Sequence, residues 1–359
     1  MAYTTIDNPE LYFQTKLYTG TGSSNAITLD GSENMQPDWV WIKCRDDSHN
    51  HQVFDSVRGV HKRMRTDTTG AETQSSESLK SFDTDGFTVG TQANVNASAS
   101  GDNSFVAWNW KAGTSFSNDA SATSVGTLDS SGSTNQTAGF SIVSYTGAGG
   151  TQSVAHNLGG TPEVIIFKCR ETATDWTTFH KGLGGANKHL SLNQTAAAGT
   201  DTDFFANTNP TSTVFSVGAA SNTNRTSEGM IAYCFRSIKG YSKFGSYTGN
   251  ASEDGIFIYT GFRPAWVVFK NISASNDWFA IDIKRDTLAP NNPVGRKSLN
   301  LNSSAVEVTR TTKDMDFVSN GIKLRTADGT QNNNGENYIY MAFAESPFVS
   351  SSGIPTTAR

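Results

Sequence analysis

Two tryptophans, Trp176 and Trp278, have the clearest chemistry to offer a ligand in this sequence. Each follows an aspartate in a polar turn, and an indole presents a large, flat apolar face on which a sugar ring can stack. We expect both side chains to be exposed and to bind carbohydrate. Burial of the two rings is the alternative that the sequence leaves open.

The other tryptophans have a spacing that favours packing over binding. Trp39 and Trp41 stand two residues apart, as do Trp108 and Trp110, so each pair lies on one face of a strand. Similar segments later in the chain carry valine and isoleucine at such positions. We therefore expect these four side chains in a hydrophobic core.

Candidate metal ligands are too few to form a site. Asp83 and Asp85 alternate as calcium ligands do, but the distal glutamate of an EF-hand loop is missing, and Gly86 indicates a turn. His49 and His51 share a strand face without a third zinc ligand nearby. The sequence predicts no metal site and no cofactor.

Catalytic signatures are missing in the same way. The sequence has no Gly-x-Ser-x-Gly elbow, phosphate-binding loop or dinucleotide fingerprint. Its 33 acidic residues allow chance carboxylate pairs of the kind that glycosidases use. None recurs at equivalent places, so we expect no enzyme and no catalytic residue, with an envelope-degrading glycosidase as the alternative.

Charge and cysteine content limit the partners. The net charge is −5, and the basic cluster at 61–65 is interpreted as a solvated loop or strand edge, so we expect no nucleic acid. No apolar run approaches the roughly 20 residues that span a bilayer, and no secretion signal is recognised. Cys44, Cys169 and Cys234 are expected to be free buried thiols of a protein made in a reducing cytoplasm.

The elements that carry these residues recur three times. A Tyr-Thr-Gly segment, a proline-led apolar strand ending in lysine and an aromatic-rich closing strand appear in that order in each copy. They lie at 18–20, 37–43 and 105–110, then at 145–147, 162–168 and 230–235, then at 247–249, 264–270 and 338–343. Repetition at this period is typical of an array of folded modules.

We predict an all-β chain of three tandem antiparallel β-sandwich modules of the jelly-roll kind. Valine, isoleucine and aromatic strands with frequent small-residue turns favour this class, and helical periodicity is nearly absent. The expected modules are 18–112, 138–240 and 241–348. They are accompanied by an N-terminal segment (1–17), a Gly/Ser/Thr linker (113–137), either flexible or an ordered surface strand, and a polar tail (349–359).

The N-terminal segment is a candidate anchor. Leu11, Tyr12 and Phe13 are apolar, lie outside the repeat, and would pack against a neighbouring subunit or an anchoring protein. The alternative is that they begin the first strand of the first module.

Four segments of the first module carry a resemblance to a known family. The segments 37–43, 53–59, 85–90 and 107–111 resemble a repeated domain of tailed bacteriophages, many of them marine. The resemblance implies sandwiches similar to concanavalin-like lectins and a virion protein made in the host cytoplasm. It covers roughly 95 residues and is weaker in the later copies, where the Phe-Asp-x-x-Arg-Gly element is lost or altered; no binding residues are carried over.

The expected function is that of a non-enzymatic virion structural protein, a tail-fibre or appendage component that presents its modules for assembly and host-surface attachment. Capsid decoration and a carbohydrate-binding module are the alternatives. Because a thin rod of three modules cannot bury all its surfaces alone, we expect a homo-oligomer, with a trimer favoured. The other expected partners are virion proteins and a host-surface glycan.

Overall fold

The computed structural model describes residues 3–99, 101, 103–286, 296–310, 312 and 314–356. Every ladder among the described strands is antiparallel, which confirms the all-β class. The helices are single turns: η1 (Pro9–Leu11), α1 (Ala93–Asn96), α2 (Ala120–Thr123), η2 (Lys181–Leu183), α3 (Ser221–Asn224) and α4 (Gly329–Asn332). Of the helices in this described part, none has the length and hydropathy to cross a membrane.

The strands form three pairs of facing sheets, called here the first, second and third sheet pairs. In the first pair a large sheet, β1-β9-β3-β4, faces a small sheet, β2-β8-β7. Its strands are β1 (Phe13–Thr19), β2 (Asn25–Thr28), β3 (Trp39–Cys44), β4 (Gln52–Asp55), β7 (Leu79–Asp83), β8 (Gly86–Val89) and β9 (Ser104–Trp110). A two-stranded sheet, β5 (Lys62–Arg63) with β6 (Thr73–Gln74), lies beside them.

The second sheet pair has the order β10-β11-β12-β19-β14-β15-β16-β17 in its large sheet and β13-β18 in its small one. Its strands are β10 (Thr114–Asn118), β11 (Ser130–Asn135), β12 (Phe140–Thr146), β13 (Gln152–Ala155), β14 (Val164–Cys169), β15 (Thr177–His180), β16 (Lys188–Ser191), β17 (Gly199–Thr200), β18 (Val214–Val217) and β19 (Gly229–Phe235).

The third sheet pair has the order β20-β28-β22-β23-β24-β25 in its large sheet and β21-β27-β26 in its small one. Its strands are β20 (Ser242–Thr248), β21 (Phe257–Tyr259), β22 (Phe262–Asn271), β23 (Phe279–Asp282), β24 (Lys297–Asn300), β25 (Val308–Thr309), β26 (Met315–Val318), β27 (Gly321–Leu324) and β28 (Asn337–Pro347).

Each sheet pair encloses a core of its own. In the first pair, Val40 and Ile42 of β3 pack with Phe87 of β8 and Phe105 of β9, and separate clusters fill the second and third pairs. Because side chains alternate across a strand, Trp39 and Trp41 of β3 point away from this core. They reach a different environment.

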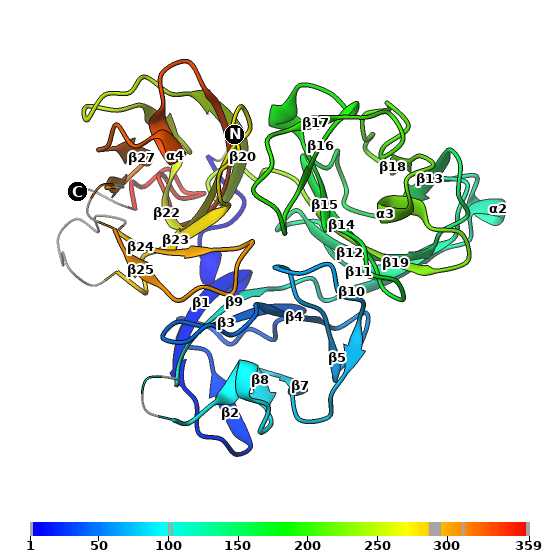
Figure 1. Ribbon diagram of the computed structural model, residues 1–359, viewed down its shortest axis with the longest axis horizontal. Helices are drawn as coiled ribbons and strands as arrows, with labels where there is room; N and C mark the ends of the chain where they lie inside the picture. Colours follow the sequence, from blue (N-terminus) through cyan, green and yellow to red (C-terminus); the bar gives the residue numbers. More distant parts are fainter. Residues whose placement is uncertain are drawn as a thin grey trace.

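That environment is a fourth core, shared by the three sheet pairs. The large sheets turn their outer faces toward one another around the centre of the molecule (Figure 1), and one hydrophobic cluster joins residues of all three. The rings of Trp39 and Tyr233 are 4.6 Å apart between centroids, those of Trp108 and Trp266 5.8 Å. Aromatic burial of this extent is a large source of stabilisation, so the sheet pairs form one body around a common centre.

The tyrosine of each Tyr-Thr-Gly segment binds the short helix at one end of its sheet pair. Tyr18 donates its hydroxyl to Val95 O, 2.6 Å away, and the equivalents Tyr145 and Tyr247 donate to the backbone of α3 and α4. Side-chain atoms beyond Cα would not fit at Gly20, where a Cβ would lie 1.9 Å from Ala97 O. The recurrence of the Tyr-Thr-Gly segment within this chain therefore reflects close packing of the backbone around the glycine.

The candidate anchor at the N-terminus belongs to the fold. Phe13 begins β1, pairs with Trp110, is 2% exposed, and stacks on Phe343 of the third sheet pair with ring centroids 5.2 Å apart. Tyr12 packs edge-on against Tyr241, and Leu11 ends η1 half-buried. The expectation that these residues reach a neighbouring subunit is wrong for Phe13, because the shared core already covers it.

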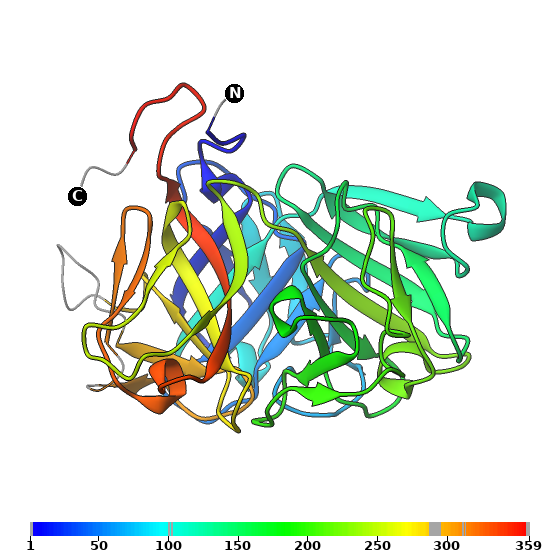
Figure 2. The ribbon, with the colours of Figure 1, turned by 90° about the horizontal axis from the view of Figure 1, so that it is seen from above.

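The segment 113–137 is ordered, so the surface-strand alternative is the one observed. β10 and β11 extend the large sheet of the second pair beyond β12, and α2 between them stands at the far edge of the molecule (Figure 2). β11 occupies the edge of β12 that β19 leaves open, where the backbone groups would otherwise be unpaired, and Phe116 and Leu128 pack against the core of the second pair. A segment with the composition of a linker thus forms two strands of the sheet.

Candidate functional site

Trp176 and Trp278 are buried, which contradicts the expectation that they are exposed sugar platforms. They are 0% and 2% exposed. Trp176 Nε1 donates to Arg65 O of the first sheet pair at 2.7 Å, and Trp278 Nε1 donates to Ser191 O of the second at 3.1 Å. Each polar turn looks solvated in the sequence because the segment that covers it is distant along the chain.

These two tryptophans belong to a set of three cyclic contacts. His51 stands at the equivalent place in the first sheet pair, and its Nε2 lies 3.0 Å from Asn300 O of the third. The first pair thus contacts the third, the second contacts the first, and the third contacts the second. We call the contact between the first and second sheet pairs the first interface. The contact between the second and third sheet pairs is the second interface, and that between the third and first is the third interface.

The first interface is built on a buried ion-pair network. Arg58, whose side chain is fully buried, pairs with Asp55 at 2.5 Å and with Glu72 at 3.1 Å. From the second sheet pair, Tyr233 donates its hydroxyl to Asp55 at 2.7 Å and Arg170 binds Glu72 through two nitrogens. Burial raises the pKa of Glu72, but hydrogen bonding by Arg170 and the Arg58 charge outweigh burial, and the pKa lies below its usual value.

The third interface repeats this network residue for residue. Arg285 pairs with Asp282 at 2.5 Å and with Glu307 at 3.2 Å. Trp108 Nε1 donates to Asp282 at 3.0 Å, and Arg45 binds both oxygens of Glu307. A charge buried in this way is costly unless it is paired and hydrogen-bonded, and here every member has both.

The second interface has the same geometry without the ions. His180 takes the place of the aspartate, and Leu183, which is 4% exposed, takes the place of the arginine. His180 Nδ1 accepts from Gly182 N at 2.9 Å, so Nε2 carries the proton and donates to Tyr340 O at 3.2 Å. Burial lowers the pKa of His180 to about 4, so the ring is neutral at pH 7.

The recurring strand lysines are structural. Lys43, Lys168 and Lys270 are 0% exposed, and each ammonium donates to backbone carbonyl oxygens, as Lys43 does to Cys44 O at 2.6 Å. Burial lowers the pKa of all three to about 8. They satisfy carbonyl groups where the central strand of each large sheet ends.

One cluster has the residue types of a metal site. Ligand atoms of Cys169, Glu171 and Glu228 lie within 4.8 Å of one another. The Cys169 thiol donates to Glu228 at 3.0 Å, and Cys44 donates to Asp46 at 3.2 Å in the first sheet pair. Because a thiol-to-carboxylate hydrogen bond recurs at the equivalent strand end, we interpret the cluster as a structural contact. None of the three cysteines forms a disulfide bond, and all three are buried, as expected.

The aspartates and histidines considered as metal ligands have other partners. Asp83 accepts from the hydroxyl of Thr88 at 2.8 Å, and Asp85 accepts from Met35 N at 3.2 Å, as the turn interpretation requires. His51 is buried in the third interface and also accepts from Trp41 Nε1 at 2.9 Å.

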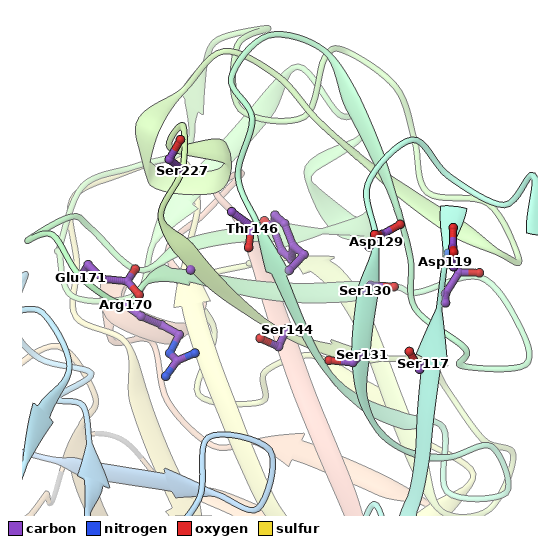
Figure 3. A pocket seen from close by; sticks show the side chains of 13 residues that line it. Ser117, Asp119, Asp129, Ser130, Ser131, Ser144, Thr146, Arg170, Glu171 and Ser227 are labelled. Carbon is purple, nitrogen blue, oxygen red and sulfur yellow. The ribbon is translucent and has the colours of Figure 1, made fainter. Parts of the chain in front are cut away.

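A polar groove lies on the second sheet pair, where β10 and β11 widen the large sheet. Figure 3 shows Ser117, Ser131 and Ser144 in a row across β10, β11 and β12, with Arg170 and Glu171 at one side. The hollow measures about 560 Å³. Ser117 is paired with Ser131, and Ser131 with Ser144, in the strand register, so the Cβ atoms of neighbouring serines are about 5 Å apart.

Three of the four charged groups that line this groove are engaged in local structure. Asp119 caps α2, Asp129 accepts from Ala120 N at 2.9 Å, and Arg170 is bound to Glu72. The serine hydroxyls and the exposed Glu171 carboxylate are therefore what the groove offers to a ligand. The hydroxyls can donate to and accept from a polyhydroxylated molecule.

One family model matches residues 8–347, and its description is "Domain of unknown function (DUF7483)". The chain belongs to this family. No curated protein and no solved structure matches the chain. The family unit spans all three sheet pairs, in agreement with a core to which all three contribute.

Sequence reasoning missed the ion-pair networks. The signal was present: Asp55-x-x-Arg58 recurs as Asp282-x-x-Arg285, each directly after an apolar strand residue. The glutamates that complete the networks, Glu72 and Glu307, have different neighbours: Glu72 stands in a polar stretch and Glu307 between two valines. Only the fold brings them to the arginines.

Proposed function

We propose that this chain is a non-enzymatic structural protein of a tailed-phage particle, in a tail fibre or another appendage. One observation carries the proposal: the recurring polar groups of the chain are bound to one another between its own sheet pairs. Asp55, Arg58 and Glu72, and their equivalents at the third interface, are partners of one another and are largely buried. Residues placed in this way fix the orientation of the parts of a scaffold.

The resemblance of the first sheet pair to a phage repeated domain supports the same proposal. The segments 37–43 and 53–59, which carry much of that resemblance, form β3, β4 and the turn that holds Arg58. Their side chains build the shared core and the first interface. Capsid decoration is the alternative placement in the particle.

The arrangement of the sheet pairs changes the reason for expecting a trimer. That expectation rested on a thin rod with surfaces to bury, whereas the three sheet pairs surround a common core (Figure 1). One chain thus achieves internally the burial that rotational symmetry gives to three chains. We retain a homo-oligomer as part of the proposal, with the trimer tested by the mass of the purified chain in solution.

Immunogold electron microscopy tests the proposal. An antibody against this chain is applied to purified particles of the phage that encodes it, and we expect gold on the tail or its appendages. Gold confined to the head would favour capsid decoration. Particles without gold, alongside a positive immunoblot of the infected-cell lysate, would refute a virion role.

A further inference from the structure

One face of the third sheet pair exposes aromatic rings where the other two pairs have small residues. The centres of β2, β13 and β21 are equivalent, because Ile27, Val154 and Ile258 are each buried opposite a buried residue of the paired strand. The flanking positions are Ala26 and Thr28 in the first pair, Ser153 and Ala155 in the second, and Phe257 and Tyr259 in the third.

The fold does not require aromatic residues at these two positions. Phe257 and Tyr259 are 44% and 49% exposed, and alternation along β21 places them on the same outward face. The Phe257 ring lies against Gly321, where a Cβ would come within 2.9 Å of its Cε2 atom. Exposed rings that the scaffold can do without indicate an interaction surface.

The rings continue onto the chain ends. The hydroxyl oxygens of Tyr259 and Tyr3 are 3.2 Å apart, and Tyr3 also donates to Gly261 O at 2.8 Å. The Tyr3 ring meets Phe348 edge-on at 6.4 Å. The described ends of the chain lie together on this side of the molecule (Figure 2), where Ser351 binds Asp7.

Two ammonium groups accompany these rings. Lys243 Nζ lies 5.1 Å from the centre of the Tyr259 ring, and Lys239 Nζ lies 4.3 Å from that of Tyr3. Within the described part of the chain, neither lysine has a carboxylate partner. Since the protein carries a net charge of −5, this local positive charge has the opposite sign to the whole.

A hollow adjoins the same residues. It measures about 530 Å³ and lies beside Tyr3 and Lys239, with the polar side chains of Thr5, Gln136 and Thr137 in its walls. Ring faces, unpaired cations and hydrogen-bonding groups therefore lie side by side. We call Tyr3, Lys239, Lys243, Phe257 and Tyr259 the aromatic face.

We propose that the aromatic face binds an acidic polysaccharide. Sugar rings have apolar C–H faces that stack on Phe257 and Tyr259, and their carboxylate or sulfate groups pair with Lys239 and Lys243. Sugar hydroxyls can form hydrogen bonds with the Thr5, Gln136 and Thr137 side chains of the hollow. This inference deepens the attachment role proposed above by naming a ligand class, and rests on that role for its biological setting. Binding is measured on the purified chain, so it can fail while particle labelling succeeds, and the reverse.

Isothermal titration of the full chain tests the proposal with three probes: oligogalacturonate, dextran sulfate and uncharged dextran. We expect binding to one or both anionic probes and none to dextran. Binding to oligogalacturonate alone identifies a carboxylate ligand, and binding to dextran sulfate alone identifies a sulfate ligand. Equal binding to dextran, or no binding to any probe, would overturn the proposal.

The aromatic variant takes its residues from the equivalent positions of the first sheet pair, Ala26 and Thr28. In Phe257→Ala with Tyr259→Thr we expect at least tenfold weaker binding with an unchanged circular dichroism spectrum. Lys239→Gln with Lys243→Gln should weaken binding and reduce its salt dependence. Ser131→Ala in the polar groove is the matched control and should bind as wild type.

Three results would contradict the assignment. Unchanged affinity in the Phe257→Ala/Tyr259→Thr variant would mean that the anionic probes bind by charge elsewhere. Loss of binding in Ser131→Ala alone would place the site in the groove. A concentration-dependent dimer or trimer that disappears in the aromatic variant, without glycan binding by wild type, would make the face an interface between copies of the chain.

Discussion

The first and second interfaces solve one packing problem with different chemistry. At the first, Asp55 and Arg58 are buried as ions and bind Tyr233 and Glu72. At the second, a neutral histidine and Leu183 occupy the same places, and His180 Nε2 donates to Tyr340 O of the partner strand. The backbone contacts are alike: Glu72 N donates to Arg170 O at 2.7 Å, and Ala198 N donates to Ile272 O at 3.1 Å.

The comparison separates what holds the sheet pairs together from what orients them. Both interfaces adjoin the shared aromatic core, so burial of apolar area supplies the association. A buried ion pair adds little net stability over well-packed apolar groups, yet it is costly when one partner is lost. The ions of the first interface thus fix how its two sheet pairs are aligned. The second interface shows that two sheet pairs can pack in the same way without ions.

The largest expected effect comes from breaking the network at one residue. Arg58→Leu leaves Asp55 buried without its cation, while Glu72 keeps Arg170, so we expect a loss of about 3–5 kcal/mol in the free energy of unfolding. Urea unfolding followed by tryptophan fluorescence measures it. Lys80→Leu, at a half-exposed lysine of β7, is the control, and a loss below about 1 kcal/mol in Arg58→Leu would show that the network is not needed.

A smaller effect is expected from pH at the second interface. The pKa of His180 is about 4 in the folded protein and about 6.5 in an unfolded chain, so the unfolded state binds more protons between these values. Stability is complete above pH 6.5 and falls as the pH drops toward 4, by about 3 kcal/mol for this group.

His180→Asn isolates that contribution, because an amide oxygen can accept the Gly182 hydrogen bond while the side chain does not titrate. Unfolding free energies of both proteins are compared at pH 7 and pH 4. His51 and His156, whose burial also lowers their pKa values, contribute equally to both proteins. Parallel pH dependence in wild type and variant would contradict the assignment.

The smallest effect is expected when the whole network is exchanged. A single variant of the first interface receives the residues of the second: Asp55→His, Arg58→Leu, Glu72→Ala, Arg170→Ile and Tyr233→Met, the equivalents of His180, Leu183, Ala198, Ile272 and Met341. Since both charges and partners leave together, we expect unfolding free energy within about 1–2 kcal/mol of wild type. A variant less stable than Arg58→Leu would show that the two interfaces are not interchangeable.

The sequence predicted the strands better than their surroundings. Proline-led and aromatic-rich apolar runs identified β3 and β9 and their equivalents, because short runs rich in valine, isoleucine and aromatic residues are typical of strands. The two-residue spacing of Trp39 and Trp41 placed both side chains on one face, in a core. It did not indicate that one face of β3 serves the sheet pair and the other serves a core shared with Tyr233 and Trp266.

The errors come from contacts between residues far apart in the chain. Trp176 follows Asp175 in a polar turn and looks solvated, yet Arg65, at a sequence separation of 111, covers it. Residues 113–137 have the composition of a linker, yet the free edge of β12 pairs with them. Local composition indicates neither the burial of Trp176 nor the strand pairing of 113–137, since both depend on a distant part of the chain that packs there.

The central claim is that the three sheet pairs are one cooperative body around the shared core. Scanning calorimetry of the full chain tests it, because the ratio of calorimetric to van't Hoff enthalpy reports how many units melt separately. We predict one reversible transition with a ratio near one, at the same midpoint as the loss of tryptophan fluorescence. Two or three resolved transitions, or a ratio well above one, would show that the sheet pairs unfold independently and would contradict the account.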